Sequence, residues 1–224
     1  MRRPRGDPAA GMASGSSLRT TPDFRVPEGE RIIDSTGIVW TRSARHLDRG
    51  AGEVDRAQYD RDEEIFGPSG AAAFYRRAML DDVAVDGEIF DTDFGSFRED
   101  ADLAWRARIL GYRGRYAPEA VAYHRRTVTP ERRSELPDYA NAHSVKNRFL
   151  MRLKNEGLGH FLRFAPWELS RDLLVVGYVL AREHASIPAL LSVPRLLPRA
   201  LAKRRKILAR RRVSDADLAR WFRG

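Results

Sequence analysis

The sequence predicts an α/β fold, with mixed strands and helices over residues 31–156 and a helical region over residues 157–224. Two β-prone runs lie on either side of an amphipathic helical pattern at residues 97–111. Beyond Gly157 the chain becomes rich in leucine and aromatic residues, and the pattern is helical. Residues 1–30 are rich in Arg, Pro, Gly and Ser, so we expect a disordered or poorly packed lead-in there.

The central helix reads FREDADLAWRARILG, and its apolar residues recur at i, i+4 and i+7 from Leu103. Gly111 follows as a helix stop. At 100° per residue, Glu99 and Asp100 lie within about 60° of the apolar side, which places two carboxylates at the start of the buried face. The alternative is that both acids only stabilise the helix dipole. Asp102, on the opposite side, is expected to form a solvated ion pair with Arg106.

Shorter patterns predict the other elements of the first 156 residues. Residues 31–41 resemble a hairpin around DSTG, and residues 44–64 a long surface loop. A GPSG turn precedes a small-residue strand at 71–75 and a short helix at 76–83. Two strands at 112–116 and 120–124 are separated by Pro118, and a long helix covers 134–155.

Composition limits the classes of protein that fit. The chain has no cysteine, so disulfides and thiolate metal sites are excluded. No apolar run approaches the roughly 20 residues that a bilayer span requires. The net charge of +9 is concentrated in residues 195–224, where eleven Lys or Arg meet two Asp.

The basic C-terminal region predicts contact with an anionic surface. Together with the aromatic residues and leucines after Gly157, it is typical of interfacial helices at a membrane. The alternative is a helical hairpin packed on its own domain. We expect no nucleic-acid partner, because the basic run lacks interleaved stacking aromatics. The predicted membrane-surface residues are Lys203, Arg204, Arg205, Lys206, Arg210, Arg211 and Arg212.

Three motifs together carry a resemblance to a known family. These are GPSGAAAFYRRAML, GEIFDTDFGSFREDADLAWRARILGYRGRYAP and AVAYH, with IDSTGI upstream. In order and spacing they resemble the second half of the family 2 glycosyltransferases, particularly rhamnosyltransferase-like enzymes of bacterial cell-wall polysaccharide biosynthesis. The resemblance covers residues 32–126, and its most specific part is ED-x-DL-x-x-R-x-x-x-x-G from Glu99 to Gly111.

The resemblance implies a GT-A fold and inverting, metal-assisted transfer of a sugar from a nucleotide-diphosphate donor to a lipid-linked or polysaccharide acceptor. It implies that Asp100 is the general base and that His124 helps to hold a divalent metal, Mg or Mn, on the diphosphate. A lone histidine at a strand end is otherwise a structural residue by default. The implied acceptor-binding residues are Gly70, Ala71, Asp91, Glu99 and Trp105.

The family's N-terminal half, which binds the donor and ends in an acidic D-x-D, has no counterpart before Ile32. We therefore expect residues 31–156 to be the acceptor and catalytic half of a truncated or split enzyme. The expected location is cytoplasmic, peripheral on the inner face of the cell membrane. The alternative is an inactive remnant that acts as a membrane or partner docking module.

Overall fold

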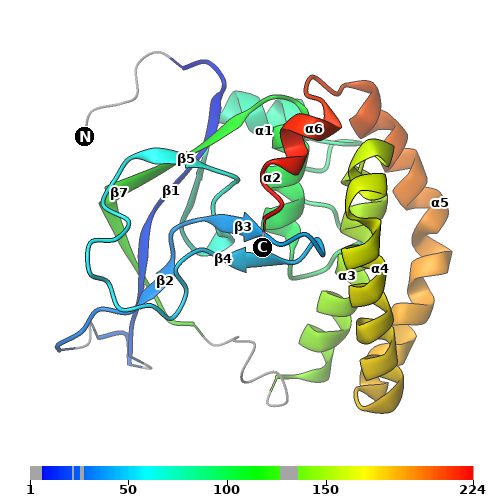
Figure 1. The fold of residues 1–224 in the computed structure, drawn as a ribbon, viewed down its shortest axis with the longest axis horizontal. Coiled ribbons are helices and arrows are strands. Elements are labelled where there is room, and N and C mark those ends of the chain that lie inside the picture. Colours follow the sequence, from blue (N-terminus) through cyan, green and yellow to red (C-terminus); the bar gives the residue numbers. More distant parts are fainter. Residues whose placement is uncertain (1–6, 22, 26–27, 127–135, 224) are drawn as a thin grey trace.

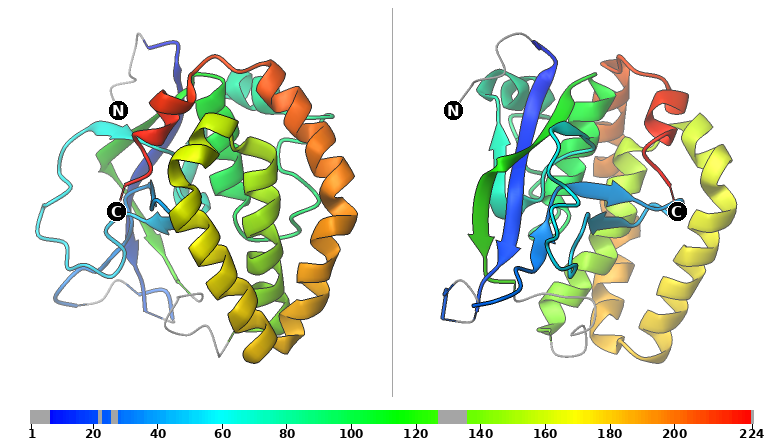
Figure 2. Two further views of the ribbon diagram at one scale, coloured as in Figure 1. Left: turned by 45° about the vertical axis from the view of Figure 1, so that its right-hand side comes forward. Right: turned by 60° about the vertical axis from the view of Figure 1, so that its left-hand side comes forward.

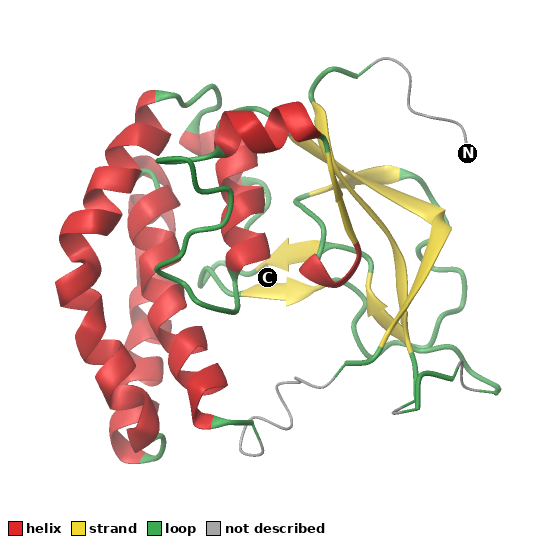
Figure 3. Ribbon diagram, turned by 180° about the vertical axis from the view of Figure 1, so that it is seen from behind, coloured by secondary structure: helices red, strands yellow, loops and turns green. Residues whose placement is uncertain are grey.

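The computed structural model describes residues 7–21, 23–25, 28–126 and 136–223. A curled mixed sheet forms one side of the molecule and a layer of long helices forms the other (Figure 1). The same two parts are seen from behind in Figure 3. The mixed α/β class and the helical C-terminal region predicted from the sequence are confirmed.

Short strands surround two long ones. The described strands are β1 (Ala10–Arg19), β2 (Ile33–Ser35), β3 (Ile38–Trp40), β4 (His46–Asp48), β5 (Glu63–Ile65), β6 (Ala73–Tyr75) and β7 (Arg113–His124). The main sheet has the order β2-β1-β7-β5, and β6 also pairs with β1. β1 and β7 are parallel, whereas the other pairs of this sheet are antiparallel. β3 and β4 form a separate antiparallel pair.

The expectation of a disordered or poorly packed lead-in over residues 1–30 is wrong for β1. This strand is central to the sheet and pairs with β7 along most of its length. Its buried positions include Ser14 and Ser17 as well as Met12 and Leu18. Because small and polar residues fill half of these positions, β1 lacks the apolar alternation that identifies a strand in a sequence.

A single strand replaces the two predicted around Pro118. The register of β7 against β1 jumps from Ala117 to Val121, so the proline lies in an irregularity of one continuous strand. A side chain at Gly15 would meet the carbonyl oxygen of Ala120 at 1.8 Å, which explains glycine at this position. The last residue of β7 is His124.

Three of the predicted short elements differ from the structure. β2 and β3 do not pair with each other, so residues 31–41 are not a hairpin: β2 joins the main sheet and β3 pairs with β4. The predicted loop 44–64 contains β4 and the first residues of β5. The predicted strand 71–75 is a 3₁₀ helix over Gly70–Ala72 followed by β6.

The described helices are α1 (Arg77–Val83), α2 (Glu99–Ile109), α3 (Asp138–Asn155), α4 (Leu158–Ala181), α5 (Ile187–Ala209) and α6 (Asp215–Ala219). The prolines at 166, 194 and 198 were expected to divide the C-terminal region, but they lie inside α4 and α5. All three are exposed, so water can bond the carbonyl that each proline leaves without a helical partner.

The core is centred on α2, which is buried from Ala101 to Ile109. Trp40, Trp105 and Phe222 meet in it with ring centroids 5.0 to 5.2 Å apart. One apolar cluster therefore joins strands of the sheet side, α2 and the end of the chain.

Candidate active site

The carboxylate of Asp100 is held at the first turn of α2. Its Oδ2 atom accepts a 2.8 Å hydrogen bond from the backbone N–H of Gly70, in the turn before β6. The sequence singled out both residues, and the structure brings them together. A Cβ at position 70 would lie 3.5 Å from the same oxygen, so a glycine leaves the carboxylate uncovered on this side.

The surroundings of Asp100 keep its charge near the point of titration. Burial raises the pKa of Asp100 to about 6, and the negative charges of Glu99 and Asp48 raise it further while the N–H of Gly70 opposes them. A carboxylate with this pKa is ionised at neutral pH and still basic enough to accept a proton efficiently. This is the range in which general bases operate.

Two buried polar atoms without hydrogen bonds lie beside this carboxylate. They are the hydroxyl of Tyr75 and the Oε2 atom of Glu99, neither of which has a partner within the described part of the chain. Burial, followed by the charges of Asp100 and Glu99, raises the pKa of Tyr75. The hydroxyl therefore stays protonated, and it is available to donate to an incoming oxygen.

A strained turn delivers Asp100 to this position. Phe97 and Arg98 adopt left-handed backbone angles, with φ of +68° and +70°, immediately before α2. The buried amide of Asn147 donates to the carbonyls of Phe94, Ser96 and Phe97. Consecutive non-glycine residues in this region are costly and persist only where surrounding contacts hold them.

Asn147 is a positioning residue that sequence reasoning missed. It was visible as a polar residue on the buried row of the predicted helix, but a single sequence does not show what such an amide bonds. Arg98 adds a second link to α3 through the carbonyl of Ser144, at 3.0 Å. Together these contacts fix the turn on α3.

His124 lies in a second polar group, at the end of β7. Its Nδ1 atom lies 2.8 Å from the Oδ2 atom of the fully buried Asp34. Arg126 bonds both Asp34 and Asp48, so its guanidinium lies between the two carboxylates. Because Asp48 also acts on the pKa of Asp100, the two polar groups are electrostatic neighbours.

The residues around His124 do not complete a divalent-metal site. With Nδ1 on Asp34, the Nε2 atom faces outward in the way of a single ligand held by a carboxylate. The two nearby carboxylates, however, are already neutralised by Arg126, and no group of three ligand atoms at His124 is found among the described residues. The implied metal therefore rests on the resemblance, and no step below depends on it.

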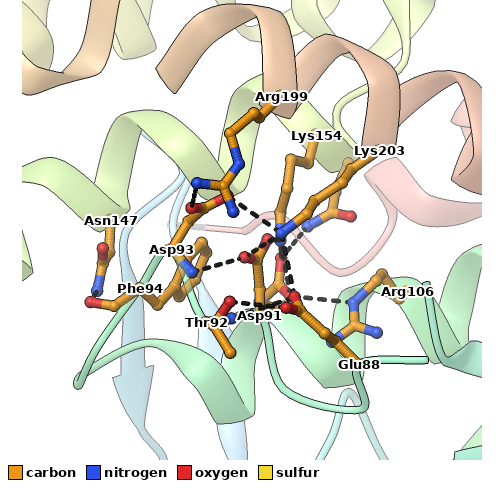
Figure 4. A network of polar contacts seen from close by, with 12 residues as sticks. Glu88, Asp91, Thr92, Asp93, Phe94, Arg106, Asn147, Lys154, Arg199 and Lys203 are labelled. Carbon is orange, nitrogen blue, oxygen red and sulfur yellow. Dashed lines mark hydrogen bonds and ion pairs between the residues drawn. The ribbon is translucent and has the colours of Figure 1, made fainter. Parts of the chain in front are cut away.

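Two of the predicted acceptor residues lie elsewhere. Trp105 is fully buried in the core against Trp40 and Phe222, so its prediction as an acceptor residue is wrong. Asp91 is also buried, and it is bonded by Lys154 on one oxygen and by Lys203 on the other (Figure 4). Burial alone would raise the pKa of Asp91, but the two ammonium groups outweigh it and lower the pKa to about 2.

The predicted solvated pair of Asp102 and Arg106 is also corrected. Both side chains are buried, and the pair is 3.0 Å long. Lys154 and Asn155 of α3 bond the same carboxylate, so Asp102 joins α2 to α3 inside the molecule. The remaining predicted residue, Ala71, is exposed in the 3₁₀ turn next to Gly70.

The basic run of α5 is largely used inside the fold. Lys203 is buried against Glu88, Asp91 and Asp93 (Figure 4). Its prediction as a membrane-surface residue is therefore wrong. The acidic segment before α2 binds most of the run's other cations: Lys206 pairs with Asp86, and both Arg210 and Arg212 pair with Asp82. Arg211 pairs with Asp215, Arg204 donates to the carbonyl of Leu153, and Arg205 is exposed.

A third polar group lies where α3 meets α4. Ligand atoms of Glu156, His160 and Glu168 lie within 4.8 Å of one another, close enough to hold an ion. Arg152, however, already bonds both carboxylates. Burial and the charge of Glu156 raise the pKa of Glu168 to about 8, so a shared proton satisfies this group at neutral pH.

A pocket of about 220 Å³ lies apart from these groups, between residues 83–86 and α5. Neither Asp100 nor His124 lines it, so it does not define the site. Comparison of this chain with protein-family models, with curated proteins and with solved structures finds no match.

Proposed function

We propose that this chain is the acceptor-side, catalytic half of a GT-A-type inverting glycosyltransferase. In this proposal it transfers a sugar from a nucleotide-diphosphate donor to a hydroxyl of a lipid-linked or polysaccharide acceptor. The observation that carries the proposal is the Asp100 carboxylate, fixed by Gly70 and by a strained turn, with a pKa of about 6. The motif resemblance supplies the reaction class.

The proposed chemistry is a single displacement. Asp100 accepts the proton of the acceptor hydroxyl as the oxygen attacks the anomeric carbon from the face opposite the leaving group. The bond from that carbon to the diphosphate oxygen breaks, and the nucleoside diphosphate leaves with the electron pair. The configuration at the anomeric carbon is therefore inverted.

Neighbouring residues have separate parts in this proposal. The free hydroxyl of Tyr75 donates to the acceptor, and Glu99 accepts a hydrogen bond from it, since both have unused buried polar atoms at this place. Arg126 and His124 face the negative charge that grows on the departing diphosphate. The implied Mg or Mn ion would act on the same charge.

The experiment is a transfer assay with a panel of nucleotide sugars and a lipid-linked glycan extract as acceptor. We expect one donor to release its nucleoside diphosphate in step with incorporation of sugar, with an inverted anomeric configuration by NMR. Release from no donor, or a retained configuration, would contradict the proposal. The first of these outcomes would favour the docking-module alternative.

A further inference from the structure

The outer face of α4 carries a continuous line of exposed leucines. Leu158, Leu162, Leu169, Leu173 and Leu180 are each between 50% and 74% exposed. At 100° per residue they lie within about 60° of one another, and they extend over about 33 Å of helix. The helix lies at the outer edge of the helical layer, on the side away from the sheet (Figure 2).

The charges of α4 do not interrupt this line. Its two acids, Glu168 and Asp172, turn toward α3, where Arg152 and Arg148 bind them. Its other charged residues are Arg163 and Arg171, and neither has an acidic partner within the described residues. The exposed part of α4 is therefore apolar with a positive edge, and it has no free acid.

Aromatic residues border the leucines. Trp167 and Tyr178 are each nearly half exposed, and at 100° per residue they lie beside Leu174 on an adjacent line. The guanidinium of Arg42 lies 5.4 Å from the ring centre of Trp167. Exposed tryptophan and tyrosine with cations nearby are typical of the zone between lipid headgroups and acyl chains.

The fold limits how α4 can meet lipid. Within the described ranges no single helix has the length and apolar character of a membrane span; residues 158–181 and 184–209 reach it only together, with a bend of 113° between them. The inner side of α4 is occupied by the core through Phe164, Glu168 and Val179. Only its outer face is open to lipid, which corresponds to a helix lying in the plane of the surface.

We propose that the outer face of α4 docks on a bilayer that contains anionic lipid, with its leucines among the acyl chains and its arginines at the headgroups. The surface differs from the one that the sequence indicated, because α5 spends most of its cations on the acidic segment before α2. Arg163 and Arg171 instead supply the charge that favours anionic headgroups.

The test is co-sedimentation with phosphatidylcholine vesicles, with and without phosphatidylglycerol. We expect the unchanged protein to bind the anionic vesicles, and less so at high salt. The double variant Leu162→Glu/Leu173→Glu should bind at least about tenfold less, since two charges replace leucines in the acyl region. The matched control Tyr139→Glu changes an equally exposed residue on α3 and should bind normally.

Circular dichroism melts of the three proteins check that all are folded. Vesicle binding that is absent in the unchanged protein, or equal in the double variant, would overturn the inference. If sedimentation velocity shows a dimer that the double variant loses, and no vesicle is bound, the face joins two copies instead. Membrane contact is independent of the chemistry at Asp100, so loss of vesicle binding with intact Asp100-dependent transfer removes this inference alone.

Discussion

The backbone N–H of Gly70 and the Oδ2 atom of Asp100 lie 2.8 Å apart, although thirty residues separate them in the chain. This hydrogen bond links the turn before β6 to the first turn of α2. Because the N–H satisfies only one carboxylate oxygen in a desolvated place, Asp100 keeps a pKa of about 6. The properties of a base follow from this pairing.

The rate of transfer should depend on pH through Asp100. The base must be ionised, so log kcat/KM should fall with unit slope as the pH drops below about 6, the pKa of the folded protein. An ordinary aspartate would place this limb near pH 4. An acid limb at pH 4, measured with a neutral acceptor, would be inconsistent with the described environment.

Replacement of Asn147 should weaken the turn that carries Asp100. Asn147→Ala leaves three carbonyls at residues 94, 96 and 97 without their donor, and we expect a loss of about 2 to 4 kcal/mol in the free energy of unfolding. Urea unfolding measures this loss. Tyr139→Ala, at an exposed position of the same helix, is the control and should change stability by less than about 0.5 kcal/mol. Equal stability of the two variants would show that the turn holds without the amide.

The basic run of α5 should divide into structural and free cations. Lys203→Met leaves Asp91 short of one partner in a buried place, and we expect a loss of about 3 kcal/mol at pH 7. Arg205→Met, two residues later and exposed, should lose almost nothing. Since Asp91 titrates at about 2 when folded and near 4 when unfolded, the difference should disappear as the pH falls toward 2. A pH-independent difference would point to packing rather than charge.

Glu168 should make the protein less stable in alkali. Its carboxyl keeps a proton up to a pH of about 8 in the folded state, whereas the unfolded chain releases it near 4.3. The folded state therefore binds more protons between these values, and the stability contributed by Glu168 falls as the pH rises through 8. Glu168→Gln should flatten the urea midpoint between pH 6 and 9, and the exposed control Glu119→Gln should not. An unflattened profile in Glu168→Gln would assign the dependence to other groups.

The helical parts of the fold were predictable because their periodicity is a local property. α1, α2 and α3 lie close to the predicted residues, and Gly111 ends α2 with a φ of +85°. β1 was not predictable, since its small residues are buried by pairing partners far away in the chain. The prolines of α4 and α5 also misled, because their tolerance depends on which side of the helix faces water.

The candidate site was predictable only where a motif carried it. Asp100, Gly70 and Glu99 were singled out and lie together, whereas Asp91 and Trp105 turned out to belong to the interior. Their partners, Lys203 and Phe222, come from the end of the chain. A single sequence does not show which distant cation or ring covers a given residue, so these two assignments could not be separated from the others.

The most direct test of the account is the rate of sugar transfer by Asp100→Asn relative to the unchanged protein, with the exposed Asp81→Asn as control. We expect Asp100→Asn to lose about 10³-fold in kcat, because the acceptor proton has no base to accept it. Its melting temperature should not fall, since a buried carboxylate of raised pKa is removed. Transfer by a folded Asp100→Asn protein within a few-fold of the control would contradict the assignment of Asp100 as the base.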